Sequence, residues 1–221
     1  ANHLLVRDYE VYGMDNLSRR KLVTQAGGNS ITPIRSFPDR QTYLHRFKNF
    51  NDRVSTVNLF DSYLISKMLQ EYKPDTIIHL AEQPSASWSM RSVHESIRTQ
   101  VDNISGTLSL LWAMREHCPN AHLIKLGTMG EYGTPNCDIP EGMIPRHCIQ
   151  NDPAATWDCP MKGLPFPRSP NSFYHLSKVH DTHNIIFACK TWGLTSTDIM
   201  QGIVFGVKVT GEEDEMQLTR F

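Results

Sequence analysis

Short strand-like runs alternate with longer helix-like runs along this chain of 221 residues, and that alternation constrains the fold more than any other feature. Residues 76–81 form a nearly continuous apolar run, which is typical of a strand buried on both faces. Residues 93–117 carry apolar side chains three and four positions apart, which predicts a long amphipathic helix. A strand over 121–127 and a helix over 172–192 repeat the pair. This order predicts βαβ units and a parallel sheet.

The rest of the chain extends the pattern less regularly. Residues 27–52 are irregular, and residues 128–170 form a long polar, proline-rich stretch that we expect to be an insertion on the substrate side of the domain. We expect further strands over 9–14, 54–59 and 195–200, and helices over 17–26 and 62–72. The predicted fold class is α/β, a Rossmann-like doubly wound parallel sheet. Ligands bind such sheets beyond the carboxyl ends of the strands, so residues just after each strand are the first candidates for a site.

Composition excludes several other classes. The 22 Lys and Arg residues nearly balance the 23 Asp and Glu residues, for a net charge of −1, so a general nucleic-acid binder is not expected. No stretch approaches the roughly 20 apolar residues of a membrane span. The five cysteines are an odd number without a CxxC pair, which fits free thiols in a reducing compartment. The histidines gather most densely at His175, His180 and His183, but no carboxylate or cysteine completes a ligand set, and we expect no metal.

Asp15 and Asn16 follow the first expected strand. A carboxylate at that place can accept hydrogen bonds from both ribose hydroxyls of an adenosine and disfavours a 2′-phosphate. A helix N-cap is the alternative interpretation. The glycine-rich turn that should precede the carboxylate by about 20 residues is absent, and residues 1–7 resemble the second half of a helix.

We therefore expect residues 1–221 to be a fragment, incomplete at both ends, of an NAD-binding Rossmann-like domain. It would lack the first strand, the glycine-rich turn and most of a C-terminal substrate lobe. Such a fragment is expected to bind NAD weakly on its own, because the turn at the first helix N-terminus holds the pyrophosphate.

Tyr174 and Lys178 lie four residues apart at the start of an expected helix, so their side chains share one face. A lysine ammonium beside a phenol lowers the pKa of the phenol, which predicts that Tyr174 is a usable base for a sugar hydroxyl. Thr128 falls directly after an expected strand, where its hydroxyl can join the proton network of the phenol. Each motif is weak alone, because Tyr and Lys occur four apart by chance in many proteins.

Together these residues resemble the extended short-chain dehydrogenase/reductase family. The resemblance extends over essentially the whole chain and is carried by residues 15–20, 32–34, 81–86, 125–135, 172–181 and 201–206. It implies NAD as the cofactor and a catalytic trio of Thr128, Tyr174 and Lys178. It further implies contacts to the cofactor from Asp15, Asn16, Arg19, Asn103, Tyr174, Lys178 and Val204, and contacts to the substrate from Thr128, His175 and Gln201.

Within this family the resemblance implies an enzyme that joins sulfite, free or delivered by a protein donor, to UDP-glucose through 4-keto and 5,6-ene intermediates. Relatives that are 4,6-dehydratases carry an acidic pair directly after the threonine, where this chain has Met129 and Gly130. These two residues cannot transfer protons, so a plain dehydratase is disfavoured. Glu131 is a candidate acid or base for C5, and His175, the neighbour of Tyr174, is a candidate for binding sulfite or for shuttling a proton.

Two alternatives stay open. UDP-glucose 4-epimerase needs only the trio, and a non-catalytic NAD- or nucleotide-sugar-binding module needs none of it. The resemblance also implies a homodimer, located in the cytoplasm of a prokaryote or in the plastid of a plant or alga.

Overall fold

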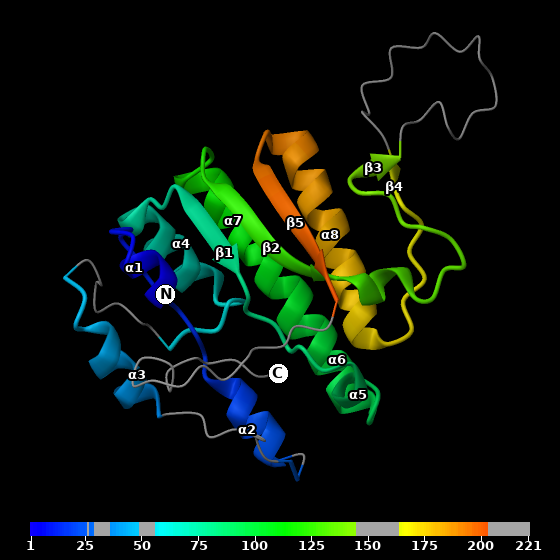
Figure 1. The fold of residues 1–221 in the computed structure, drawn as a ribbon, viewed down its shortest axis with the longest axis horizontal. Helices are drawn as coiled ribbons and strands as arrows, with labels where there is room; N and C mark the ends of the chain where they lie inside the picture. The colour runs from blue at the N-terminus through cyan, green and yellow to red at the C-terminus, as the bar shows by residue number, and fades with distance from the viewer. Residues whose placement is uncertain (26, 29–35, 49–55, 145–163, 203–221) are drawn as a thin grey trace, which may run out of the picture.

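A three-stranded parallel sheet forms the centre of the computed structural model, which describes residues 1–25, 27–28, 36–48, 56–144 and 164–202. The strands lie in the order β1 (Thr76–His79), β2 (His122–Thr128) and β5 (Thr195–Gln201), with β2 in the middle (Figure 1). The predicted strands over 76–81, 121–127 and 195–200 are confirmed, each with slightly different ends. The α/β class with a parallel sheet is confirmed as well.

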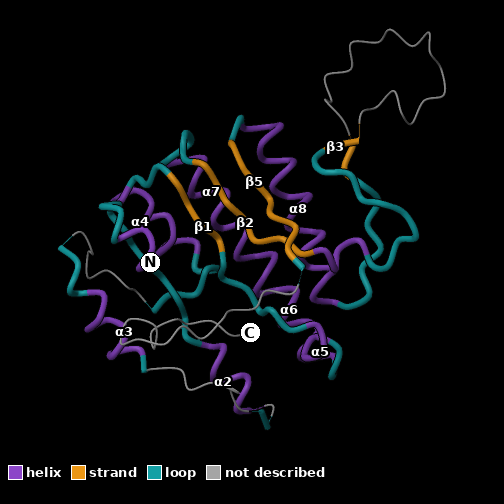
Figure 2. Tube along the Cα trace, in the orientation of Figure 1, coloured by secondary structure: helices purple, strands orange, loops and turns teal. Residues whose placement is uncertain are grey.

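Three helices pack behind this sheet, as Figure 2 shows. They are α4 (Ser62–Tyr72) and α8 (Phe173–Trp192), close to the predicted ranges, and α7 (Gly106–His117), which forms the C-terminal part of the helix predicted over 93–117. None of the helices in the described part of the chain is long and apolar enough to cross a membrane. The remaining described elements are α1 (Asn2–Leu5), α2 (Ser18–Gln25), α3 (Phe37–Leu44), α5 (Ala86–Ser89), α6 (Val93–Gln100), η1 (Val101–Ser105), η2 (Met129–Tyr132), and the antiparallel pair β3 (Met143–Ile144) and β4 (Leu164–Pro165).

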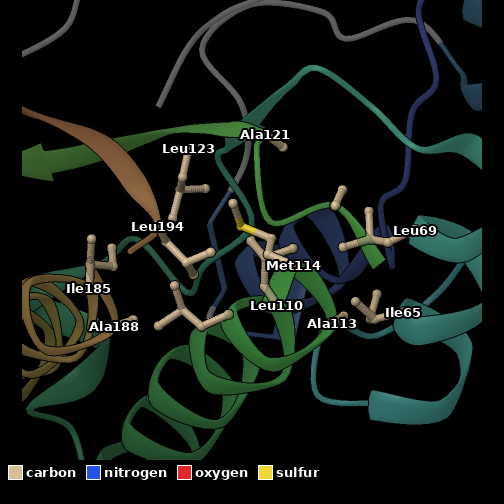
Figure 3. Packing of buried hydrophobic residues seen from close by; sticks show 12 residues of the cluster. Ile65, Leu69, Leu110, Ala113, Met114, Ala121, Leu123, Ile185, Ala188 and Leu194 are labelled. Carbon is tan, nitrogen blue, oxygen red and sulfur yellow. The ribbon is translucent and has the colours of Figure 1, made fainter. Parts of the chain in front are cut away.

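The apolar core lies between the sheet and these helices (Figure 3). Met114 of α7 and Ile65 of α4 are fully buried. Leu123 of β2, which belongs to the same cluster, is 1% exposed. The core cluster comprises Ile65, Leu69, Leu110, Leu111, Ala113, Met114, Cys118, Ala121, Leu123, Ile185, Ala188 and Leu194. It draws on helices separated by more than a hundred residues, so it fixes α8 beside the sheet.

The predicted helix over 93–117 is divided in three. One turn of π-helix, η1, separates α6 from α7. A π turn inserts one extra residue and re-aims the side chains around it. Here it turns Asn103 into the interior, where the side chain is fully buried. The division therefore serves the site, as described below.

The predicted strand over 9–14 does not form, and the described part of the predicted strand over 54–59 is not a strand. Val11 and Met14 occur only in isolated bridges, and Thr56 to Asn58 adopt no strand, while residues 54 and 55 lie outside the described residues. A strand persists only when a neighbour accepts and donates its backbone hydrogen bonds. No described strand pairs with these segments, so their alternating pattern has no ladder to join.

The prediction that residues 76–81 are buried on both faces is wrong for this chain. Ile78 is 45% exposed and Leu80 is 64% exposed. The described helices α4, α7 and α8 cover the opposite face of the sheet (Figure 1). Apolar side chains that point away from these helices, Ile199 of β5 among them, therefore meet solvent.

Candidate active site

The predicted catalytic and substrate residues meet where the strands end. Thr128 is the last residue of β2, and Gln201, the last residue of β5, lies directly opposite it in the register. Lys178 of α8 reaches the same edge, because its Nζ donates a hydrogen bond to the Leu126 carbonyl of β2 at 2.5 Å. Residues far apart in the sequence thus share the carboxyl edge of the sheet, as the order of the elements predicts.

The first turn of α8 orients the phenol and the ammonium. Ser172 caps the helix by accepting a hydrogen bond from the His175 backbone N–H at 3.1 Å. The Tyr174 backbone N–H donates to Ser89 Oγ at 3.0 Å, which ties the turn to α5. Tyr174 is partly buried, whereas the Lys178 side chain is only 4% exposed. The four-residue spacing on one helix face is therefore confirmed.

Lys178 is paired with a carboxylate that was not predicted as a site residue. Its Nζ lies 2.5 Å from Glu82 Oε1, and both side chains are 4% exposed. Glu82 follows β1 and is the first charged residue after the apolar run over 76–81. That contrast was the signal in the sequence that could have identified Glu82.

This pairing overturns the prediction about the phenol. The pKa of Tyr174 is raised above its ordinary value, first by burial and then by the carboxylates of Glu82 and Glu131. Arg19 of α2 lies close enough to lower that pKa, but its effect is the smaller. The prediction that the phenol is made more acidic is thus wrong for the chain alone, because burial and the two carboxylates outweigh the nearby positive charge.

His175 fills the place of the missing acidic pair. A Cβ on Gly130 would collide with the Nε2, Cδ2 and Cε1 atoms of the His175 ring. The opposite nitrogen, Nδ1, lies 2.7 Å from Asn171 Oδ1, an acceptor, which assigns the proton to Nδ1 and leaves Nε2 basic. Burial lowers the pKa of His175, so the ring is neutral at neutral pH. The His175 ring therefore packs against Gly130, which follows Thr128 by two residues in the sequence.

Glu131, the other candidate for moving a proton, is held in a buried ion-pair cluster. Its Oε1 accepts a hydrogen bond from Thr182 Oγ1 at 3.1 Å and lies 3.7 Å from Lys125 Nζ. Its Oε2 lies 3.1 Å from Arg168 Nε. The Glu131 side chain is fully buried. These contacts occupy both carboxylate oxygens within the protein, which favours His175 over Glu131 for proton transfer.

Asn103 supports the site from below. Its Oδ1 accepts from the Gln83 backbone N–H at 2.8 Å, and its Nδ2 donates to Ser177 Oγ at 2.9 Å and to the Gln83 carbonyl at 3.3 Å. The residue is fully buried. Asn103 therefore joins the loop after β1 to α8, and its predicted contact to a cofactor stays a prediction.

The remaining predicted cofactor residues lie near the N-terminus. Asp15 is exposed, and its Oδ1 accepts a hydrogen bond from the Leu17 backbone N–H at 2.7 Å. Asn16 Nδ2 donates to Asn58 Oδ1 at 2.6 Å, so the two segments meet. Arg19 is exposed on α2, with its charge near Tyr174. Val204 lies outside the described residues.

The donor and acceptor set fits a dinucleotide. Asp15 offers an exposed carboxylate for ribose hydroxyls, and Lys178 holds an ammonium at the sheet edge where such ligands bind. Among the described residues no group of three or more His, Cys, Asp or Glu side chains is arranged to hold a metal ion.

The sequence matches one family model along its whole length. Residues 1–221 match the NAD dependent epimerase/dehydratase family. The chain belongs to this family. NAD is accordingly the family's cofactor.

Two curated relatives carry the same name. UDP-sulfoquinovose synthase, chloroplastic, from Spinacia oleracea is 41% identical over 210 residues, which are 94% of this chain and 41% of the relative. UDP-sulfoquinovose synthase from Sulfolobus acidocaldarius is 34% identical over 221 residues, which are 100% of this chain and 54% of the relative. The chain thus spans about half the length of the curated relatives it matches.

Solved structures share the fold. UDP-glucuronic acid 4-epimerase from Bacillus cereus superposes with a TM-score of 0.61 at 18% identity and covers 89% of this chain and 50% of its own. UDP-glucose 4-epimerase from Thermotoga maritima superposes with a TM-score of 0.57 at 21% identity and covers 90% and 49%. These similarities establish the Rossmann-like fold.

Replacing Gly130 by alanine should displace the His175 ring. The added methyl group would occupy the space of the imidazole, so the ring must move toward solvent and lose its bond to Asn171. We expect the pKa of His175 to rise toward its ordinary value, because burial is what lowers it. An NMR titration of the ring proton, assigned with His175→Gln, measures this pKa. Gly202→Ala is the control, because no atom of the described residues lies within 4 Å of its Cβ position. An unchanged midpoint in Gly130→Ala would contradict the packing described here.

Proposed function

We propose that the protein containing this chain is a UDP-sulfoquinovose synthase, which converts UDP-glucose and sulfite to UDP-sulfoquinovose and water with a tightly bound NAD that is regenerated. The observation that carries the proposal is the imidazole of His175 at Gly130, in the place where dehydratase relatives have a carboxylate. The trio of Thr128, Tyr174 and Lys178 at the same edge supports a sugar oxidised at C4. The names of both curated relatives support the substrates.

Tyr174 acts as the base for the first step. Its phenolate oxygen takes the proton of the C4 hydroxyl. Thr128 Oγ donates a hydrogen bond to the C4 oxygen of the sugar and so holds the sugar in place. Lys178 fixes the position of the bound ligands from beneath, because its ammonium is anchored to Leu126 and Glu82. Bound NAD supplies the redox chemistry by accepting a hydride from C4 and returning it at the end.

His175 carries the second proton transfer. The 4-ketone acidifies the C5 proton, and Nε2, the unprotonated nitrogen, takes that proton. The resulting imidazolium returns it to the C6 hydroxyl, which leaves as water when the C6–O bond breaks. Sulfite, entering as hydrogen sulfite, then adds at C6 of the 5,6-ene. The 5,6 π bond breaks and C5 takes up the proton that the hydrogen sulfite loses, so a carbon–sulfur bond replaces the carbon–oxygen bond. Gln201, opposite Thr128, is placed to hold the sugar.

Incubation of the full-length protein with UDP-glucose, NAD and sulfite tests the proposal directly. Mass spectrometry should detect UDP-sulfoquinovose. Formation of UDP-galactose without incorporation of sulfite would instead identify a UDP-glucose 4-epimerase. Binding of NAD and UDP-glucose without any turnover would identify a non-catalytic binding module. We expect the enzyme in the cytoplasm of a prokaryote or in the plastid of a plant or alga.

Tyr174→Phe and Lys178→Ala should each lower the turnover number by about 10²-fold or more, because the first removes the general base and the second removes the ammonium that positions the bound ligands. Steady-state kinetics of the full-length protein measure the loss. The matched controls are Tyr63→Phe on α4 and Lys190→Ala on α8, both at exposed positions. Near-normal turnover in either active-site variant would exclude that residue from the mechanism.

Without sulfite the enzyme should release little UDP-4-keto-6-deoxyglucose. Met129 and Gly130 replace the acidic pair, so no carboxylate adjoins Thr128 to return a proton to C5 when a hydride is delivered to C6. The reaction mixture without sulfite, followed by mass spectrometry over time, measures this product. Its rapid accumulation would show that another group performs the dehydratase step.

We also propose that the protein is a homodimer. The helices α6, η1 and α7 expose one apolar stripe at helical spacing, formed by Val93, Ile97, Val101, Leu108 and Trp112. A stripe on long helices can pack against its own copy about a two-fold axis. Light scattering of the full-length protein should give a dimer, and Ile97→Asp should give a monomer. Leu64→Asp, an exposed apolar position on α4, is the control. A dimer that survives Ile97→Asp would place the interface elsewhere.

A further inference from the structure

The loop after β1 carries a buried carboxylate that uses only one of its oxygens. Glu82 Oε1 lies 2.5 Å from Lys178 Nζ, and the Glu82 side chain is 4% exposed. Glu82 Oε2 is buried and has no hydrogen-bond partner in the part of the chain that the structure describes. Burying a carboxylate oxygen without a hydrogen-bond donor destabilises the fold, so the position of this oxygen calls for a structural or functional explanation.

The position of Glu82 suggests that the missing donor belongs to a ligand. Glu82 follows the carboxyl end of β1, and ligands of open parallel sheets bind at that edge. Its negative charge also lies close enough to Tyr174 to raise the pKa of the phenol. The unpartnered oxygen is therefore part of the site that contains the phenol, rather than of the distant core.

The loop is fixed on its buried side. Next to Glu82, the Gln83 backbone N–H donates to Asn103 Oδ1 at 2.8 Å, and Gln83 Nε2 donates to Thr99 Oγ1 at 2.9 Å. Gln83 is 5% exposed, and Asn103 and Thr99 are fully buried. These bonds anchor the backbone beside Glu82 to α6 and η1, so the carboxylate is preorganised for binding.

Lys178 completes a donor and acceptor pair with Glu82. An ammonium has three N–H donors. Two of them serve Glu82 Oε1 and the Leu126 carbonyl, which leaves one for a ligand. Two hydroxyls on adjacent carbons suit this pair, because one can accept from Lys178 while the other donates to Glu82 Oε2.

We propose that Glu82 is a binding residue of the active site, whose second carboxylate oxygen accepts a hydrogen bond from a ligand diol while the first holds Lys178. The diol is that of the cofactor ribose or that of the substrate sugar. The inference rests on the proposed function, which supplies both ligands.

Calorimetric titration of the cofactor-free full-length protein with NAD, and separately with UDP-glucose, tests the proposal. In Glu82→Gln the amide oxygen can still accept from Lys178, but an N–H₂ group replaces the accepting oxygen. We expect the Kd of the ligand that supplies the diol to rise about tenfold and that of the other to stay unchanged. Glu116→Gln, at an exposed carboxylate of α7, should change neither.

A second measurement does not depend on the folding of a variant. Wild-type protein is titrated with NAD lacking the hydroxyls of the nicotinamide ribose and with singly deoxygenated UDP-glucose analogues. One analogue should bind about tenfold more weakly than its parent, and Glu82→Gln should add little to that loss.

The remaining outcomes separate the two proposals. Equal binding of wild type and Glu82→Gln to both parent ligands would overturn this inference alone. Equal binding of all analogues by wild type would do the same, since a water molecule would then satisfy Oε2. Wild-type protein that binds neither NAD nor UDP-glucose would overturn the proposed function and, with it, this inference.

Discussion

The ammonium of Lys125 is the buried charge on which the placement of the active-site helix depends. It lies on β2 with a fully buried side chain, and its Nζ donates to the Lys178 carbonyl at 3.1 Å and to Thr182 Oγ1 at 2.9 Å, both on α8. Asp198 Oδ2, at 3.5 Å, supplies negative charge from β5. A buried ammonium without such partners would be strongly destabilising. The charge therefore fastens α8 to the sheet at the turn that carries Lys178.

The buried charges of Lys125 and Asp198 also explain why β2 has a glycine at position 127. A Cβ on Gly127 would collide with Asp198 Oδ1, so the strand must lack a side chain where the carboxylate crosses it. On the far side, Glu131 links Lys125 to Arg168, whose guanidinium also lies over the Tyr132 ring, 4.3 Å from its centroid. The residues after Thr128 are held by charge as well as by packing, which positions Gly130 against His175.

The sequence predicts those parts of the molecule that depend on periodicity. The strands over 121–127 and 195–200 and the helices over 62–72 and 172–192 need only their own apolar pattern and a core to face. The positions of Thr128 at a strand end and of Tyr174 and Lys178 on one helix face follow from the direction and spacing of these elements, whereas their catalytic roles are implied by the resemblance and stay a prediction. Strand formation over 9–14 and 54–59 is not predictable in this way, since it depends on partners that the pattern itself does not supply.

The electrostatics of the site also escaped prediction, because they depend on pairs distant in the sequence. Glu82 lies 96 residues from Lys178, and no local pattern indicates that their charges meet. The pKa of Tyr174 is raised, first by burial of the phenol and then by the carboxylates of Glu82 and Glu131. A raised pKa keeps the phenol protonated at neutral pH.

For Tyr174 to act as a base, positive charge must therefore enter the site or negative charge must leave it. Arg19 is the cation that already lowers the pKa of the phenol, but it lies on an exposed helix. In the proposed function, oxidised NAD would bring the positive charge of its nicotinamide ring into the site, whereas exclusion of water alone would raise the pKa of the phenol further. In this arrangement the base is activated by the assembled complex rather than by the chain alone.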